Sequence, residues 1–221
     1  MPLSAACAES RSVTRPVLVA TRNSGKLREL LPWFAAAGLS IETLDDAALV
    51  TTPEEDDLEM YDTFEGNALA KARWFFSRSD GRVVVAEDSG LEVDALHGAP
   101  GVRSKRWSGR SDLVGEALDT ANNVHLLTEL AGVPVQARTA RYVCAAACVW
   151  SLGAVVVRGE TAGRITLTGS GTHGFGYDPY FHADDLAMTF AEAERDAKTR
   201  VSHRGRAFTA LLAAHRTRGV L

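Results

Sequence analysis

The sequence has few cysteines and no long apolar run. Its three cysteines in 221 residues are too few for a disulfide framework. Cys144 and Cys148 lie among alanines, which predicts small buried residues rather than metal ligands. No apolar run approaches the roughly 18 residues that span a bilayer, and residues 1–15 lack the apolar core of a signal peptide. We therefore expect a protein of the reducing cytoplasm with no membrane partner.

The chain also lacks a strong excess of either charge. It has 24 Lys and Arg against 28 Asp and Glu, a formal net charge of -4, which argues against a general nucleic-acid binder. The 46% hydrophobic content over 221 residues is that of a folded protein with a sizeable core. We find no internal repeats or linker, and expect residues 1–15 to be a disordered extension and residues 16–221 to form a single α/β domain.

What is present begins with a strand, a polar loop and a helix. The apolar run Val17–Ala20 predicts a short buried strand, residues 21–26 form the loop, and a helix follows from Leu27 to Gly38. This arrangement presents backbone amides to a phosphate, but it is not a Walker A loop: Ala20 stands where the first glycine belongs, and Leu27 where the magnesium-binding hydroxyl belongs.

Two interpretations of this loop remain open. In one, Asn23 and Lys26 hold an anion at the start of the helix. In the other, the loop caps the helix and Lys26 is an ordinary surface lysine.

The central stretch, VVVAEDSGLEVDAL, predicts two strands joined by an acidic turn. Val83–Ala86 forms the first strand and Leu91–Leu96 the second, with Glu87 and Asp88 between them beside Gly90. Carboxylates at a strand end are typical of ligand sites in α/β proteins. The alternative is a solvated turn without function.

An acidic connection and a helix precede this stretch. Residues 42–62 carry five clustered carboxylates, including Glu59, a pattern typical of a solvated loop. Thr63 is the expected N-cap of a helix over Phe64–Phe76. Gly66 stands where a capping box would place Glu or Gln, which predicts a weaker helix start.

After the central stretch we expect a helix and a hairpin. The helix covers Asp112–Leu130, and the hairpin joins Arg141–Trp150 to Ala154–Val157.

Two further segments carry candidate ligand contacts. Residues 169–179 hold several glycines beside Phe175 and Tyr177, which predicts either an aromatic face for a base or a turn with two core aromatics. A basic cluster then precedes a helix expected at Ala207–His215. Cations oppose the dipole at a helix start, so the cluster indicates either a bound anion or a solvated turn. The cluster comprises Lys198, His203, Arg204 and Arg206.

Together these pieces predict a nucleoside polyphosphate held with a metal. Two separate basic sites, one around Lys26 and one around Lys198 to Arg204, suit phosphates. The carboxylates Glu59, Glu87 and Asp88 suit Mg²⁺, which prefers oxygen ligands and bridges phosphates. One carboxylate would then orient or deprotonate an attacking water.

At this point the sequence resembles the inosine triphosphate pyrophosphatases over about Val17 to Leu212. The matching pieces are ATRNSGKLREL, Glu59 with TFEGNALAKAR, AEDSGLEVDALHGAPGVRSKRWSG, GFGYDPYF and KTRVSHRGRAF. Five separated motifs in order are far more specific than any one of them.

The resemblance implies Mg²⁺-dependent hydrolysis of the non-standard purine nucleotides ITP, dITP and XTP to the monophosphate and pyrophosphate. It implies an elongated α/β fold, with a central mixed sheet flanked by helices and two lobes forming a substrate cleft, commonly as a homodimer. It places the metal on Glu59 and Asp88, makes Asp88 the proton acceptor, and adds Lys71 and Glu87 to the catalytic group. The implied substrate contacts are Thr21, Arg22, Asn23, Ser24, Gly25, Lys26, Ser89, Phe175, Gly176, Tyr177, Asp178, Lys198, His203 and Arg204.

Departures from the family pattern leave the base preference open. They are Gly66, Met60-Tyr61-Asp62, Thr161 and His173. The alternatives are a pyrophosphatase for another nucleotide, such as a modified pyrimidine or a biosynthetic intermediate, a phosphatase, and a nucleotide-binding module without turnover.

Overall fold

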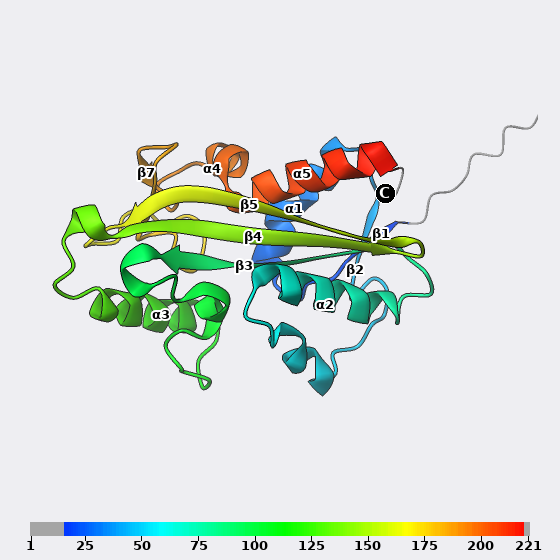
Figure 1. Cartoon of the computed structure of the whole chain (residues 1–221), viewed down its shortest axis with the longest axis horizontal. Helices are drawn as coiled ribbons and strands as arrows, with labels where there is room; N and C mark the ends of the chain where they lie inside the picture. The colour runs from blue at the N-terminus through cyan, green and yellow to red at the C-terminus, as the bar shows by residue number, and fades with distance from the viewer. Residues whose placement is uncertain (1–15, 219–221) are drawn as a thin grey trace, which may run out of the picture.

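The computed structural model describes residues 16–218 and contains one seven-stranded sheet in the order β2-β1-β3-β4-β5-β6-β7 (Figure 1). The expected disordered extension, with Cys7, lies outside the described residues. The strands are β1 (Val17–Val19), β2 (Ile41–Thr43), β3 (Val84–Val93), β4 (Thr139–Trp150), β5 (Gly153–Ile165), β6 (Phe181–Ala183) and β7 (Met188–Thr189). The pairs β1–β2 and β1–β3 are parallel and the others antiparallel, so the predicted mixed α/β sheet is confirmed.

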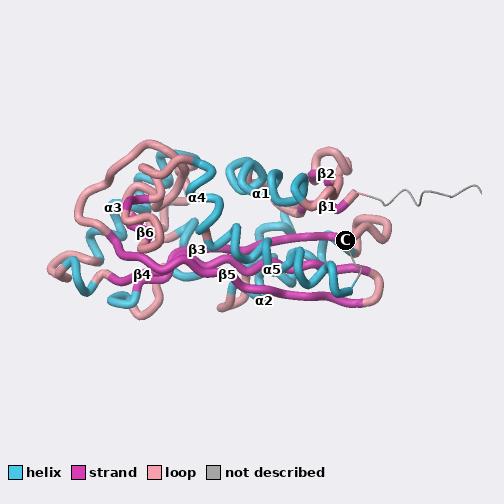
Figure 2. Tube along the Cα trace, turned by 90° about the horizontal axis from the view of Figure 1, so that it is seen from above, coloured by secondary structure: helices cyan, strands magenta, loops and turns pink. Residues whose placement is uncertain are grey.

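Five α-helices flank this sheet in the described part of the chain. They are α1 (Ser24–Ala36), α2 (Phe64–Phe76), α3 (Gly115–Glu129), α4 (Arg195–Val201) and α5 (His203–Arg218). Short 3₁₀ helices include η1 (Pro53–Glu59) and η3 (Gly101–Arg106). The long strands β3, β4 and β5 run side by side along the molecule and give it its elongated shape (Figure 2). Between residues 16 and 218, no helix combines the length and the apolarity that crossing a bilayer requires.

Helices cover both faces of the sheet because its central strands contain continuous apolar runs, at Val17–Val19 in β1, residues 84–86 in β3 and residues 143–149 in β4. Val84 and Ala86 pack in the cluster with α2, whereas Val85 packs in the cluster with α1 and α5. Successive residues of a strand point to opposite faces, so such a continuous apolar run serves two layers. Ala146 on β4 and Ala72 on α2 belong to these two layers, where small side chains let the helices approach the sheet.

The central stretch is one ten-residue strand, so the prediction of two strands with an acidic turn was wrong. Gly90 does not break the strand. A β-carbon there would lie 2.4 Å from the Ser104 hydroxyl and 2.6 Å from the Gly101 carbonyl oxygen, so the glycine admits η3 against β3. The Ser104 hydroxyl also accepts the Leu91 amide at 2.8 Å, which fixes this contact.

The strand that ends beside the carboxylates is β1. Its register pairs Leu18 with Val84 and Val19 with Val85, and β1 stops there while β3 continues. Glu87 and Asp88 therefore lie on β3 just past the end of its neighbour. The edge of β3 opens at this place, and a ligand can reach it.

Several predicted boundaries shift. Helix α1 begins at Ser24 instead of Leu27, and α3 begins at Gly115 instead of Asp112. Helix α5 begins at His203, so the basic cluster belongs to α4 and α5 and does not precede them. The acidic connection, expected as a solvated loop, holds the end of β2 and the 3₁₀ helix η1. The predicted helix Phe64–Phe76 is confirmed, as is its Thr63 cap, whose hydroxyl accepts the Gly66 amide at 3.1 Å.

Gly159 provides a test of how α5 packs on the sheet. A β-carbon at Gly159 would lie 2.3 Å from backbone atoms of His203 and Ala207. We expect Gly159→Ala to lower the free energy of unfolding by about 1–3 kcal/mol, measured by urea denaturation. Gly153→Ala in the same strand is the control, because its β-carbon would meet only the Trp150 ring at 3.4 Å. Equal stability of the two variants would contradict this close approach.

Candidate active site

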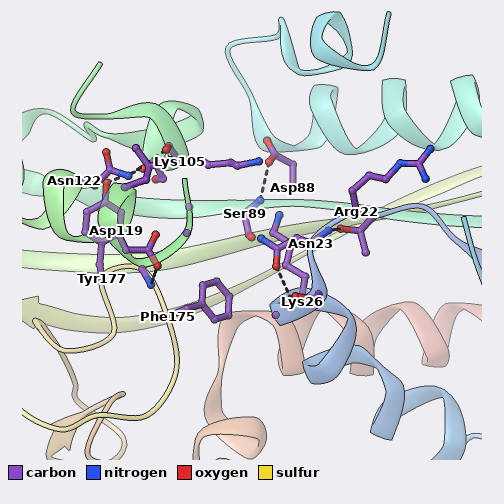
Figure 3. A pocket seen from close by; sticks show the side chains of 18 of the residues that line it. Arg22, Asn23, Lys26, Asp88, Ser89, Lys105, Asp119, Asn122, Phe175 and Tyr177 are labelled. Carbon is purple, nitrogen blue, oxygen red and sulfur yellow. Dashed lines mark hydrogen bonds between the residues drawn. The ribbon is translucent and has the colours of Figure 1, made fainter. Parts of the chain in front are cut away.

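A cleft of about 1370 Å³ lies over the open edge of β3. Every predicted site residue except Glu87 lines it. Figure 3 shows the labelled side chains that gather there: Asn23, Lys26, Asp88, Ser89 and Phe175, with Lys105, Asp119, Asn122 and Tyr177 on a second wall.

Asp88 is the carboxylate on the floor of this cleft. It is 5% exposed, its Oδ2 accepts the Asn67 amide at 2.9 Å, and its Oδ1 accepts the Ser89 backbone N–H at 3.0 Å. Burial raises the pKa of Asp88, and Glu59 adds to that effect, while Lys26 and Lys71 oppose it. A carboxylate with a raised pKa in a cleft is suited to accept a proton.

Glu59 reaches the cleft from the end of η1. Lys71 donates to its Oε1 at 2.5 Å and also to the backbone carbonyl of Glu87 at 3.2 Å. Burial alone would raise the pKa of Glu59, but the Lys71 ammonium holds it below its ordinary value. Glu59 is therefore ionised at neutral pH, next to a cation that neutralises it.

Glu59 and Asp88 form a donor set that fits a magnesium ion delivered with a nucleotide. Mg²⁺ is usually held by one or two carboxylates together with substrate phosphates and water. Among the described residues no group of three or more His, Cys, Asp or Glu side chains is placed to hold a metal by itself. A metal that takes its remaining ligands from phosphate and water needs only such a pair.

Glu87 lies behind the wall of the cleft, on the face of β3 opposite Asp88. It is 1% exposed, and its Oε1 lies 2.7 Å from the Lys26 ammonium. Its Oε2 lies 3.7 Å from the Arg204 guanidinium and 3.4 Å from the Cys144 sulfur. Burial opposes its charge, but Lys26 and Arg204 hold the pKa of Glu87 well below its ordinary value. It orders these two cations at the cleft.

The cations at the other end of the cleft are held by Glu29, which the sequence analysis did not single out. Glu29 accepts from the Lys198 ammonium at 2.9 Å and forms an ion pair with Arg204. Burial opposes its charge, yet the two cations lower the pKa of Glu29 to about 2. The only sequence signal was its position one turn after Lys26 on a helix face.

His203 is neutral at physiological pH. It is 4% exposed, and burial together with the neighbouring Arg204 lowers its pKa well below the ordinary value. Its ring stacks on Tyr142 with centroids 4.7 Å apart. Arg204 also donates to the Ser89 hydroxyl at 2.9 Å, so α5 and β3 meet directly at the cleft.

The glycine-rich loop is shaped by its own Asp178. Its Oδ2 accepts the Phe175 amide at 2.9 Å and the Lys198 ammonium at 2.7 Å, and a β-carbon at Gly174 would lie 2.0 Å from that oxygen. Phe175 lines the cleft beside Gly25, whereas Tyr177 is 5% exposed and donates its hydroxyl to the Ser104 carbonyl. Both aromatics of the loop therefore line the cleft, and Tyr177 also packs in the core, while the base-binding face stays a prediction.

A family model described as the Ham1 family matches residues 17–214 of the chain. The chain belongs to the Ham1 family. It is 50% identical over 208 residues to a dITP/XTP pyrophosphatase of Mycobacterium tuberculosis strain H37Rv, covering 91% of this chain and 95% of that protein. It is 45% identical over 198 residues to the dITP/XTP pyrophosphatase of Nitratidesulfovibrio vulgaris, covering 89% and 93%.

Solved structures of Ham1 proteins have the same fold. A HAM1 protein from Coxiella burnetii superposes with a TM-score of 0.78 at 27% identity, covering 91% of this chain and 98% of that one. A nucleoside-triphosphatase / dITP/XTP pyrophosphatase from Mycobacterium abscessus superposes with a TM-score of 0.69 at 42% identity, covering 90% and 99%.

In the N-terminal loop of this Ham1 protein, the structure confirms the helix cap of the second interpretation and contradicts its surface lysine. Asn23 caps α1, because its side-chain oxygen accepts the Lys26 amide at 3.0 Å. Lys26 is not a surface lysine, because its ammonium pairs with Glu87. Glu87 and Asp88 raise the pKa of Lys26 above its ordinary value against the effect of burial. Whether the loop holds an anion stays a prediction.

Helix α3 adds cleft residues that the sequence analysis missed. Asp119 accepts the Gly176 amide at 2.9 Å, and Asn123 donates to the Gly176 carbonyl at 2.9 Å. Asn122 accepts the Ser108 amide at 2.8 Å and donates to the Lys105 carbonyl at 3.1 Å. Two adjacent asparagines within a predicted helix were the available signal, but their partners lie far away in the chain.

The departures from the family pattern have local explanations at two positions. A β-carbon at Gly66 would lie 2.8 Å from the Tyr61 side chain, so Gly66 accommodates Tyr61. Thr161 is fully buried and donates to the Val201 carbonyl at 2.7 Å, so it joins β5 to α4. His173 is exposed and lines the cleft, so it does not fill core space.

The buried Glu87 provides a stability test. We expect Glu87→Gln to lower the free energy of unfolding at pH 7 by about 3–5 kcal/mol, because it leaves two buried cations without their shared anion. Urea denaturation measures this loss. The control Glu160→Gln removes a surface partner of Arg158 and should cost no more than about 1 kcal/mol.

The pH dependence of that loss has a definite sign. The pKa of Glu87 is depressed in the folded protein, so its contribution to stability is present above the ordinary glutamate pKa of about 4.3. The contribution declines as the pH falls from there towards the folded-state value. The gap between wild type and Glu87→Gln should therefore narrow below about pH 4. A gap independent of pH would contradict the ion-pair assignment.

Proposed function

We propose that this Ham1 protein is a nucleoside triphosphate pyrophosphatase acting on dITP, XTP and ITP. The observation that carries the proposal is Asp88, a buried carboxylate with a raised pKa at the open edge of β3, between cations and opposite Glu59. The naming of relatives up to 50% identical as dITP/XTP pyrophosphatases supports the choice of substrate.

The proposed reaction is hydrolysis of the anhydride between the α- and β-phosphates. A water molecule attacks phosphorus, Asp88 accepts its proton, and the bridging oxygen leaves with the pyrophosphate. Lys26 and Lys71 flank Asp88 and offset the negative charge of the phosphates. Positioning and charge neutralisation are the main requirements of phosphoryl transfer. Asp88, Lys26 and Lys71 are residue types that can meet both requirements.

Glu59 and Asp88 are the residues proposed to hold Mg²⁺. When bound, the ion would neutralise phosphate charge and polarise the scissile anhydride. The ion pair of Glu59 with Lys71 keeps this carboxylate ionised and oriented before the nucleotide arrives.

The base is proposed to lie against Phe175, next to Lys198, His203 and Arg204. Ammonium and guanidinium groups donate hydrogen bonds and accept none. They therefore favour a base edge with oxo groups, as in hypoxanthine and xanthine, over the 6-amino group of adenine. Glu29 and Asp178 hold these cations in place.

The homodimer implied by the resemblance and the cytoplasmic location expected from the few cysteines stay predictions for this chain. Sedimentation equilibrium of the purified protein would decide the first.

A product assay tests the activity. With Mg²⁺ present, dITP, XTP and ITP should yield equimolar monophosphate and pyrophosphate, with ATP turned over at least about 100-fold less efficiently. Ion-exchange chromatography identifies both products. Orthophosphate as the first product would indicate a phosphatase. Pyrophosphate from a pyrimidine nucleotide alone would overturn the base assignment while retaining the chemistry.

The role of Asp88 is tested by Asp88→Asn. We expect turnover to fall by at least about 1000-fold, because both the proton acceptor and a proposed metal ligand are lost. Circular dichroism and nucleotide binding should stay near those of wild type. Glu92→Gln, a carboxylate of the same strand outside the cleft, is the control. In wild type, kcat/KM should fall with decreasing pH through a pKa above the ordinary value of aspartate. Turnover by Asp88→Asn within about tenfold of wild type would exclude the assignment.

A further inference from the structure

Arg22 follows directly after the loop's first residue, yet its guanidinium is directed away from the middle of the cleft. Figure 3 shows its side chain turned away from Lys26 and Asp88. Its Nε donates to Glu55 Oε2 at 3.1 Å and one terminal nitrogen donates to Glu55 Oε1 at 2.9 Å. That nitrogen also donates to the Leu49 carbonyl at 2.8 Å, and the other contacts Asp45 at 3.2 Å.

This geometry is a two-point fork on one carboxylate with further contacts on each side. Every nitrogen of the guanidinium has a protein acceptor, and the side chains of Arg22 and Glu55 are only 29% and 13% exposed. Glu55 raises the pKa of Arg22 above its ordinary value. Arg22 is a predicted substrate contact by its place in the motif, but a phosphate would have to displace Glu55 from this fork.

The partners of Arg22 all belong to the segment that carries Glu59. Glu55 lies four residues before Glu59 in η1, and its Oε1 also accepts the Thr52 amide at the start of that helix. From the opposite side Lys71 on α2 holds the Glu59 carboxylate. Two contacts therefore hold the segment 44–60 in place around Glu59. Arg22 binds Glu55, which precedes Glu59 in the chain, and Lys71 binds Glu59 itself.

We propose that Arg22 is a positioning residue that fixes the segment 44–60 against the N-terminal loop and so places Glu59 for the metal. The role of Glu59 in this inference rests on the proposed function. The attachment of the segment 44–60 by Arg22 does not. Lysine cannot replace Arg22, because an ammonium lacks the planar fork that engages both carboxylate oxygens.

The test uses Arg22→Lys and Arg22→Ala, with Arg110→Ala as the matched control. Arg110 also forms a fork on a carboxylate, that of Asp112, but outside the cleft. Hydrogen–deuterium exchange of the nucleotide-free protein reports on the segment 44–60. Initial rates at varied Mg²⁺ and varied nucleotide separate the two ligands.

Both Arg22 variants should raise the exchange rates of amides in the segment 44–60 while leaving those of β4 unchanged. The Mg²⁺ concentration for half-maximal rate should rise about 10-fold, as is typical when the support of a metal ligand is removed. The KM for nucleotide at saturating Mg²⁺ should stay within about threefold of wild type. Glu55→Ala should reproduce the effect, and Arg22→Ala/Glu55→Ala should be no worse than either single variant. Arg110→Ala should change none of these quantities.

A raised nucleotide KM with unchanged exchange would overturn the proposal and make Arg22 a substrate contact. Unchanged exchange together with unchanged Mg²⁺ dependence would overturn it as well. Absence of turnover in wild type would refute the proposed function. The hydrogen–deuterium exchange rates of the Arg22 variants would still show whether Arg22 holds the segment 44–60. If Arg22→Ala does not fold, Arg22→Lys still provides the test, because it keeps the positive charge and removes only the fork.

Discussion

The buried ion pairs around Glu87 and Glu29 are the constraint on which the rest of the cleft depends. Three carboxylates, Glu29, Glu87 and Asp178, face three cations, Lys26, Lys198 and Arg204, with little solvent among them. Burying any one of these charges alone would cost several kcal/mol, on the order of 3–5, so each requires its partner. Because α1, β3, the glycine-rich loop, α4 and α5 each contribute a member, the electrostatic balance aligns these elements.

The position of the cleft follows from the unequal lengths of β1 and β3. Two register pairs join them, and β3 then continues beside no strand on that edge until η3 packs against it. A gap in a sheet would normally expose backbone groups. Here it exposes Asp88 and the adjacent backbone to a ligand, while Glu87 on the opposite face secures the basic residues. Strand alternation thus assigns neighbouring carboxylates to different tasks.

The elements predicted from the sequence were those with strong local patterns. Phe64–Phe76 had a cap and a regular apolar face, and its bounds were correct. The region around Gly90 was misjudged because a glycine after two acidic residues normally indicates a turn, and the reason for this glycine is the distant η3. The same applies to Glu29, Asp119 and Asn123, whose partners lie on other elements. Arg22 was carried over as a substrate contact with its motif, since no local pattern reveals that Glu55 occupies its guanidinium.

The sequence by itself determined the α/β class, which residues belong to the separated motifs, and the kind of chemistry. These properties depend on residue type and on spacing within each segment. The tertiary structure decided which carboxylate faces the cleft, which cations are already paired, and which segment each loop supports. Those properties depend on strand register and on contacts between residues far apart in the chain. Their energies arise only after burial has removed water from both partners.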